Sequence, residues 1–460
     1  MAFVFYDLET TGMSPAFDQP LQFAAIRTDD NFAELERVNF RCRIATHIIP
    51  SPKALIVTGI TPAQLVDPKL PSLFEFTQAI MELTELWAPA TWVGFNTIRF
   101  DEEVLRQAFY QNLQPNIYAT QLNGNTRLDI LTAVYAVWCR NPGLMNWPTD
   151  DTGRTTFKLD RLAPANGFNA HNAHDALGDV EATIHIARII ANGDTALWSA
   201  ILQNRDKQNV TATLETFRPL ELVLRFGGGS PRSYVGCFCG TAARNPNQAA
   251  FFDLEAGDPE ALMLADDAAL FQAVYGAPQI IRSISINKSP SLFPITNPDF
   301  NHLRKAALIE ANPAFRARIG KAIAARYNAE PAVPPQSVEK RIYSGFYAKA
   351  DRELLAEFQL ADWPRRREVV DLLTDVRLRQ LGRRLIAFHA PEIMTAEEAE
   401  SFKAFLRERW TADVPEAEWT TIASAKRAIT ELRSQLGAEN ALLDEIDEFI
   451  RQVLSVTGRG

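Results

Sequence analysis

The alternation of short apolar runs with amphipathic stretches over the first 190 residues is the feature that most restricts the fold. Four apolar runs have the length of strands, at 3–8, 21–27, 38–44 and 91–95. Apolar residues recur at helical spacing in five further stretches, at 72–87, from 101 onward, and at 128–138, 157–166 and 175–190. Early strands followed by mixed strands and helices predict an α/β domain over 1–192, built on a central mixed sheet.

The remaining chain changes character twice, as expected for 460 residues, which exceed what one hydrophobic core organises. Short β-like runs at 221–226, 234–238, 250–254 and 280–286 alternate with glycine, proline and polar residues, and predict a small barrel or sandwich domain over 196–338. After a proline-rich connection at 330–335, helical periodicity predicts an all-helical C-terminal domain over 340–460.

Composition narrows the class of protein. Hydrophobic residues make up 47% of the chain and charged residues 22%, which indicates a folded protein. No apolar run is long enough to span a membrane, and the N-terminus lacks the basic region of a secretory signal. Four cysteines are too few for a disulfide framework, and Cys237 and Cys239 lack the second pair of a zinc site, so two positions on one strand face are favoured. We therefore expect a cytoplasmic protein.

The net charge of −9 argues against a protein that coats nucleic acid through a basic surface. It does not exclude a nuclease, because catalytic carboxylates add negative charge and a DNA path can be a local basic groove on an acidic body.

Two acidic residues close the first predicted strand. Residues two apart on a strand point to the same face, so Asp7 and Glu9 present paired carboxylates. A divalent cation would offset their mutual repulsion, and Mg²⁺ prefers such hard oxygen ligands. The alternative is a solvent-exposed strand end, since an Asp-x-Glu pattern is common by chance.

Two later segments carry further candidates. Asp101 follows a predicted strand and turn, where it can serve as a helix N-cap. His174 lies at the start of the predicted helix 175–190, and Asp179 lies beside the apolar stripe of that helix, where a buried carboxylate needs a partner. The alternative for this segment makes Asp175 a helix cap and leaves His174 in solvent.

In the order Asp7 and Glu9, then Asp101, then His174 and Asp179, these residues resemble the three motifs of the DEDDh superfamily of 3′→5′ exonucleases. Within it, longer strings resemble the bacterial exodeoxyribonuclease I family. The strings are 22–29, 58–62, 99–104, 146–148 and 172–176, with 286–288 and 341–343 in the later part of the chain.

The resemblance implies a ribonuclease H-like exonuclease domain, an SH3-like β-barrel domain and an all-helical C-terminal domain. It implies a magnesium-dependent, processive 3′→5′ exonuclease that degrades single-stranded DNA to 5′-mononucleotides in DNA repair or recombination. Asp7 would bridge two Mg²⁺ ions, for which Mn²⁺ can substitute. Glu9 and Asp179 would bind one ion, Asp101 would hold the other, and His174 would accept the proton of the attacking water.

The resemblance also implies substrate-binding positions and departures from the family. Leu8 and Thr10 would approach the terminal nucleotide, and Lys158 would bind substrate where the family has arginine. The first motif lacks the aromatic residues that surround these acids in the family, and the barrel region matches poorly around 244–247. A monomer is expected.

A basic stretch at 363–384 holds seven arginines and three acids, an excess of four positive charges. We single out five of these arginines as a candidate patch: Arg365, Arg366, Arg367, Arg377 and Arg384. Three interpretations stay open: solvated helix charge, contacts with DNA phosphates, or a dock for the acidic C-terminal tail of single-stranded-DNA-binding protein, which the exonuclease I family binds.

Two other functions fit parts of the sequence. An RNA or oligonucleotide 3′→5′ exonuclease of the same superfamily would carry the same active-site residues, but the long chain beyond the catalytic domain favours a long-strand DNA enzyme. A non-catalytic nucleic-acid-binding scaffold would have no need of all five catalytic residues.

Overall fold

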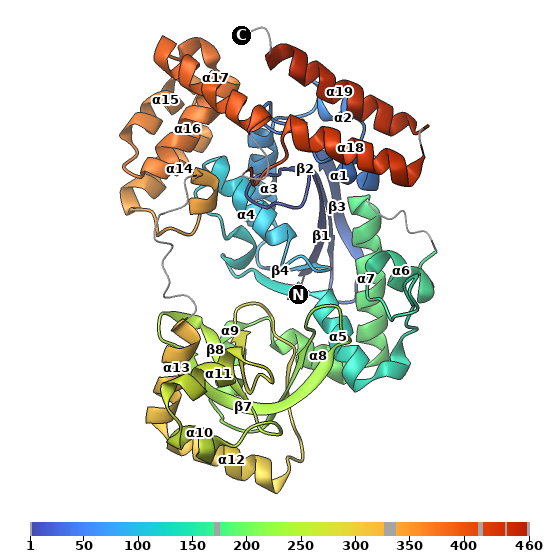
Figure 1. Cartoon of the computed structure of the whole chain (residues 1–460), viewed down its shortest axis with the longest axis vertical. Helices are drawn as coiled ribbons and strands as arrows, with labels where there is room; N and C mark the ends of the chain where they lie inside the picture. Colours follow the sequence, from blue (N-terminus) through green and yellow to red (C-terminus); the bar gives the residue numbers. More distant parts are fainter. Residues whose placement is uncertain (1, 170–174, 326–336, 413–416, 438, 458–460) are drawn as a thin grey trace.

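The computed structural model describes residues 2–169, 175–325, 337–412, 417–437 and 439–457. A mixed sheet lies at the centre of the molecule, a second sheet with its own helices lies on one side, and a group of C-terminal helices lies on the other (Figure 1).

The central sheet has the strand order β3-β2-β1-β4-β5. Its strands are β1 (Ala2–Thr10), β2 (Pro20–Thr28), β3 (Glu34–Arg41), β4 (Ala90–Gly94) and β5 (Thr126–Asp129). The first three strands pair antiparallel, whereas β4 pairs parallel with both β1 and β5, so the predicted mixed sheet is confirmed. The third strand lies a few residues earlier than its apolar run suggested.

Strand β1 is buried on both faces, which fixes the position of its acidic end. Phe3 and Phe5 pack into one apolar core, while Val4, Tyr6 and Leu8 pack into another across the sheet. Alternating side chains of a strand point to opposite faces, so a strand between two cores reads as a continuous apolar run.

The helices around the central sheet are α1 (Pro52–Thr58), α2 (Pro62–Leu65), α3 (Leu73–Leu86), α4 (Asp101–Gln111), α5 (Ile130–Arg140), α6 (Leu159–Ala165) and α7 (Ala176–Gly193). Helices α3 and α4 cover one face of this sheet, α5, α6 and α7 cover the other, and α1 and α2 pack against the C-terminal helices. Ser72 and Glu75 form a capping box that starts α3. The helix expected over 128–138 starts at Ile130, because Asp129 caps it by accepting a hydrogen bond from the Leu131 backbone N–H.

The middle of the chain contains a second, fully antiparallel sheet in the order β10-β6-β7-β8-β9. Its strands are β6 (Leu220–Leu224), β7 (Arg232–Ala242), β8 (Asn245–Asp253), β9 (Ile281–Ser285) and β10 (Leu292–Pro294). All four predicted β runs fall on these strands. Among the described residues β9 and β10 form the two edges of this sheet, so the expected SH3-like barrel is not confirmed.

The sequence did not predict six further helices, which are α8 (Thr195–Gln203), α9 (Lys207–Leu214), α10 (Pro259–Leu264), α11 (Asp267–Tyr275), α12 (Phe300–Ala311) and α13 (Pro313–Ala325). Among the described residues five of them, α9 to α13, accompany this sheet, while α8 packs with α7 in the core of the central sheet. Helix α13 packs closely on β7 at Gly320, where a Cβ would lie 2.4 Å from the Thr241 carbonyl oxygen. Cys237 and Cys239 are both free thiols buried in β7, as the strand interpretation predicted.

The C-terminal part is helical, as predicted. Its helices are α14 (Lys349–Leu360), α15 (Trp363–Leu372), α16 (Val376–His389), α17 (Ala396–Thr411), α18 (Ile422–Leu436) and α19 (Ala441–Thr457). The described residues also form four 3₁₀ turns: η1 (Ala119–Gln121), η2 (Pro142–Leu144), η3 (Val338–Arg341) and η4 (Pro391–Ile393). Helices α18 and α19 pack on α1 in a shared apolar core that includes Leu55 and Trp410. No helix among the described residues is long and apolar enough to cross a membrane.

A buried ion-pair network fixes the first turn of α4. Glu102, 1% exposed, accepts hydrogen bonds from Arg106 at 2.7 Å, from Arg127 of β5 and from Thr120. Arg127 also donates to the backbone oxygen of Asn287, at 2.6 Å, and so ties the central sheet to the loop between β9 and β10.

Replacing Glu102 by alanine should destabilise the protein strongly, because Arg106 and Arg127 would lose a buried carboxylate. The expected loss is about 3–5 kcal/mol, seen as a lower urea midpoint. Glu34→Ala is the matched control, because Glu34 pairs with Arg37 while both side chains are more than 40% exposed; its loss should stay below about 1 kcal/mol. Equal losses in the two variants would contradict a structural role for the network.

Candidate active site

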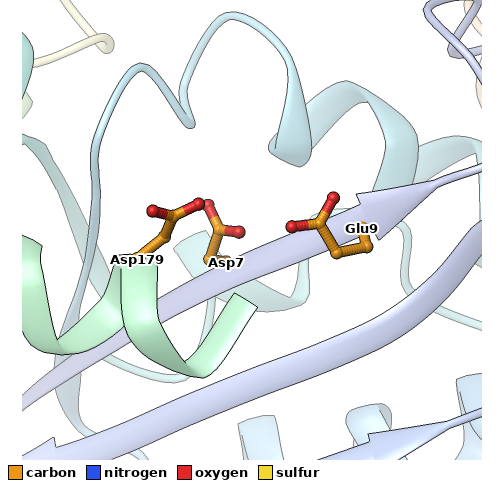
Figure 2. Close-up of side chains that lie close together, drawn as sticks. All are labelled: Asp7, Glu9 and Asp179. Carbon is orange, nitrogen blue, oxygen red and sulfur yellow. The ribbon is translucent and has the colours of Figure 1, made fainter. Parts of the chain in front are cut away.

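The end of β1 and the first turn of α7 bring three carboxylates together. Ligand oxygens of Asp7, Glu9 and Asp179 all lie within 4.8 Å of one another. Figure 2 shows the Asp7 and Asp179 carboxylates facing each other, with the Glu9 carboxylate directed toward them from further along β1. The side-by-side placement predicted for Asp7 and Glu9 therefore holds, and α7 adds the third acid.

Helix α7 packs on the sheet through its apolar face, and a hydrogen bond from β2 fixes its first residues. Asp175 occupies the N-cap position, but its side chain does not cap the helix. Its carboxylate instead accepts from Nε2 of Gln22, at 3.0 Å, and Gln22 lies opposite Glu9 in the β1–β2 register. Asp175 therefore is the N-cap residue, as the alternative expected, but without a side-chain capping hydrogen bond, and its contact with Gln22 helps to place Asp179 beside β1.

Asp101 joins the cluster electrostatically. It is 6% exposed and is the first residue of α4, whereas the N-cap position belongs to Phe100, which corrects the N-cap interpretation. Burial, together with the charges of Asp129 and Asp179, raises the pKa of Asp101 to about 7, against the lowering effect of hydrogen bonds from backbone groups. Asp101 therefore lies close enough to the three carboxylates to feel their charge.

The cluster carries more negative charge than its surroundings neutralise. Burial raises the pKa of Asp7 well above its ordinary value, with further contributions from Asp101, Asp179 and Glu9. Burial and the charges of Asp179 and Asp101 raise the pKa of Glu9 to about 8, and Arg41 offsets this only in part. Convergent, partly desolvated carboxylates are the donor set of a hard divalent cation, so these residues fit such an ion.

Asp129 was missed by the sequence analysis, although it shapes the site. Its buried carboxylate accepts backbone N–H bonds from Asn96 at 2.8 Å and Ile98 at 3.3 Å, and so holds the turn that leads into Asp101. Asn96 has a φ of 66°, a left-handed conformation that asparagine tolerates. The available signal was an aspartate directly before an apolar helical run, which is an N-cap pattern.

The predicted substrate residues lie in different settings. The Leu8 side chain is buried in a core, so only its backbone can face a ligand. Thr10 donates from Oγ1 to the backbone oxygen of Gly12 at 2.7 Å. Lys158 is exposed at the N-cap position of α6. His174 lies outside the described residues.

The five arginines of the candidate patch do not share one exposed surface. Arg365 pairs with Glu357 and Glu368, and Arg367 pairs with Asp371 and Glu398. The other three make the following contacts: Arg366 donates to the backbone oxygens of Phe358 and Gln359, Arg384 pairs with Glu339, and Arg377, 4% exposed, pairs with Asp375. These guanidinium groups hold the C-terminal helices together.

Four arginines of the same stretch line an open groove: Arg379 and Arg383, together with Arg367 and Arg384 of the candidate patch. Arg379 and Arg383 lie along α16, and the groove between α16 and α17 measures about 1060 Å³. Phe402 and Phe405 of α17 contribute aromatic surface to it. Glu397, Glu398 and Glu408 of α17 also line the groove, so it carries charge of both signs, with Arg379 and Arg383 on the α16 side.

Comparison with known protein families finds matches to the N-terminal and the C-terminal part of the chain. Residues 4–187 match the exonuclease family model, and residues 336–453 match the model of the exonuclease I C-terminal domain. The chain is 31% identical to exodeoxyribonuclease I of Escherichia coli, over 82% of this chain and 83% of that protein. It is 30% identical to exodeoxyribonuclease I of Haemophilus influenzae, over 97% and 98%.

Solved structures agree over nearly the whole chain. A moderately thermophilic exonuclease I from Methylocaldum szegediense superposes with a TM-score of 0.84 at 27% identity, over 98% of this chain and 99% of that one. E. coli exonuclease I in complex with a dA16 oligonucleotide gives 0.82 at 27% identity, and an SSB/exonuclease I structure with an inhibitor gives 0.82 at 26%, each with the same coverage.

Because the pKa of Glu9 is raised in the folded state, the free energy of unfolding of the metal-free protein should depend on pH. The ordinary pKa of 4.5 rises to about 8 in the folded state, so the Glu9 contribution to stability is full below pH 4.5 and is lost as the pH rises toward 8. Glu9→Gln should therefore raise the melting temperature in EDTA at pH 8 and have little effect at pH 4.5. Mg²⁺ should stabilise the wild type more than this variant.

The control is Glu82→Gln, an exposed position on α3, which should follow the wild type at both pH values. Parallel loss of stability in the wild type and Glu9→Gln between pH 4.5 and 8 would contradict the electrostatic assignment.

Proposed function

The chain belongs to the exodeoxyribonuclease I family, and from that membership we propose that it is a magnesium-dependent exonuclease that degrades single-stranded DNA in the 3′→5′ direction to 5′-mononucleotides. The observation that carries the proposal is the convergence of Asp7, Glu9 and Asp179 on one point at the end of a buried strand. A processive role in DNA repair or recombination accords with it.

The proposed metal ligands are the acids of the cluster. Asp7 would be shared by two ions, Glu9 and Asp179 would complete one coordination shell, and Asp101 would serve the other. The ions supply Lewis acidity, which activates water and stabilises charge on the leaving oxygen of an in-line displacement. Four carboxylates in a partly desolvated site, with raised pKa values for Asp7, Glu9 and Asp101, are the chemical reason to expect that demand for cations.

The protein itself positions the reacting groups. Strand β1 holds Asp7 and Glu9 rigidly because both of its faces are packed, and the Gln22–Asp175 hydrogen bond holds the start of α7. We assign to His174 the removal of a proton from the attacking water, since an imidazole with an ordinary pKa near 6.5 suits that task around neutral pH. His174 directly precedes the Asp175 that this contact fixes.

Single-stranded DNA is the substrate that the comparisons favour, because solved exonuclease I structures contain such oligonucleotides and resemble this chain over almost its full length. An RNA or oligonucleotide exonuclease would use the same carboxylates. The C-terminal helices α18 and α19 pack on α1 of the exonuclease region. Such an additional helical region suits an enzyme that follows a long strand.

The proposed protein partner is the acidic tail of single-stranded-DNA-binding protein, in keeping with the SSB/exonuclease I structure among the similar ones. We place its dock on the groove between α16 and α17, where Arg379 and Arg383 supply charge and Phe402 and Phe405 supply apolar surface. An acidic tail with an apolar end would match both features.

Two substitutions test the chemistry. Asp7→Asn should remove nearly all hydrolysis while single-stranded DNA binding in EDTA persists, because the change touches only the cation site. His174→Ala should slow hydrolysis by about 10²–10⁴-fold and flatten the low-pH limb of the rate profile. The measurement is mononucleotide release from labelled single-stranded DNA, with RNA of the same sequence in parallel.

Duplexes with single-stranded ends test polarity in the same assay. A 3′ overhang should be trimmed to the duplex, and a 5′ overhang should persist. Faster release from RNA than from DNA would favour the RNA exonuclease, and an Asp7→Asn variant with more than about a tenth of wild-type turnover, roughly 1.4 kcal/mol of barrier, would refute the metal assignment.

A charge-reversal variant tests the partner surface. Arg379→Glu/Arg383→Glu should leave hydrolysis of naked DNA unchanged and reduce digestion of DNA coated with single-stranded-DNA-binding protein, because only the tail contact is lost. Arg365→Glu, at a paired position on α15, is the matched control. If naked DNA binding weakens and its salt dependence falls by about 0.7 per lost contact, the groove contacts DNA instead.

A further inference from the structure

Phe346 is the most exposed large apolar side chain among the described residues, and the packing of the fold does not explain its exposure. Its ring is 98% exposed, although burying a phenylalanine side chain stabilises a protein by about 1.5–3 kcal/mol. It lies in the loop 341–348, between η3 and α14.

The loop that carries Phe346 is held in place on both sides of the ring. Arg377, which is buried, donates to the backbone oxygens of Arg341 at 2.8 Å and Gly345 at 3.2 Å. Its guanidinium also lies 5.2 Å from the ring centre of Tyr347. Gly345 has a φ of 121°, in the region that favours glycine. The exposed ring is therefore presented on an anchored turn.

The same loop is fixed to the helix that carries Asp101. The Tyr343 hydroxyl donates a hydrogen bond to Oε2 of Glu103 at 2.5 Å, and Glu103 is two residues from Asp101 on α4. Arg106 pairs with Glu103 at 2.7 Å and braces this contact. The position of Phe346 is thus tied, through one hydrogen bond, to the first turn of α4.

A cationic side chain from the second sheet is held against the same turn. Arg127, paired with Glu102, donates to the Asn287 backbone oxygen and so fixes the loop between β9 and β10. The next residue, Lys288, is exposed as a whole, but its ammonium is partly buried. That burial, with the charges of Arg106 and Arg127 and against the charge of Glu103, lowers its pKa. An exposed aromatic ring and a partly buried ammonium are therefore carried by two loops that are each anchored to side chains of α4.

We propose that Phe346 is a base-stacking residue for the single-stranded substrate on its way to the carboxylate cluster, with Lys288 contacting a phosphate of the same strand. This inference rests on the proposed function and adds to it a strand-binding position outside the metal site. Stacking on an aromatic ring accepts any base, which an enzyme that degrades every sequence requires, and phosphate contacts are equally independent of sequence.

A nucleic acid fits this surface better than a protein does. A protein interface buries a core of several apolar side chains, whereas Phe346 lies among Ser344, Gly345 and Ala348, with Lys349 beyond, and all four are exposed. A ring and a separate cation on two loops anchored to one helix are a combination that a strand of alternating bases and phosphates can contact.

The test compares binding of a thymine oligonucleotide with binding of an abasic oligonucleotide of the same length, in EDTA, by fluorescence anisotropy. Phe346→Ala should weaken binding of the thymine strand by about five- to a hundredfold and leave binding of the abasic strand unchanged. Phe346→Trp keeps an aromatic ring and should bind the thymine strand as tightly as the wild type. Phe300→Ala is the matched control, because Phe300 is 80% exposed at the start of α12, at the far end of the molecule in Figure 1, and it should bind both strands like the wild type.

The lysine is tested with the same two strands. Lys288→Gln should weaken both equally and lower the salt slope by about 0.7. Phe346→Ala binding as tightly as the wild type would overturn the inference, and so would equal losses on the thymine and abasic strands, which would mean that the loop acts only structurally. Wild-type protein that fails to degrade single-stranded DNA would overturn the proposed function instead, so the two failures are distinguishable.

Discussion

Electrostatic repulsion among the carboxylates at the end of β1 is the constraint on which the rest of the structure depends. Asp7, Glu9 and Asp179 converge within 4.8 Å, and Asp101 is close enough to raise the pKa of Asp7. Such an arrangement persists only where the surrounding structure over-determines it. Here the two apolar cores around β1 and the hydrogen bond between Gln22 and Asp175 supply that rigidity.

Much of this arrangement was predictable because it follows from local rules. A strand between two cores is continuously apolar, so β1 was visible in the sequence, and alternation placed Asp7 and Glu9 on one face. The features that the sequence did not reveal also have a physical explanation. Strand β5 has only four residues and carries Arg127 in its interior, and that charge is tolerated because Glu102 arrives from another element to pair with it. No local pattern reveals such a partner. For Asp129 at the end of β5 the N-cap pattern was available, but its hydrogen bonds to the backbone of Asn96 and Ile98 come from another part of the chain.

The arginine-rich stretch shows the limit of counting charges. Its excess of positive charge suggested a surface, yet Arg377 is buried against Asp375 and two backbone oxygens, and Arg384 pairs with Glu339 from η3. A guanidinium group offers five donors and a long apolar stem, so it can fasten helices together as readily as it can face solvent. Whether it does either depends on carboxylates and carbonyls distant in sequence. Whether the second sheet closes into a barrel also depends on contacts between strands that are distant in sequence. The individual strands therefore could not show whether the expected barrel forms.

The first turn of α4 shows how one short sequence can serve several parts of the molecule. Successive residues of a helix point about 100° apart, so three consecutive acids face three directions. Asp101 interacts with the charges of the carboxylate cluster. Glu102 pairs with Arg127, which also donates to the backbone oxygen of Asn287. Glu103 accepts the hydrogen bond of the Tyr343 hydroxyl. The central sheet, the second sheet and the C-terminal helices therefore meet within one helical turn. Because Asp101 is fixed by the same turn that its neighbours anchor, contacts made far from the cluster help to set its geometry.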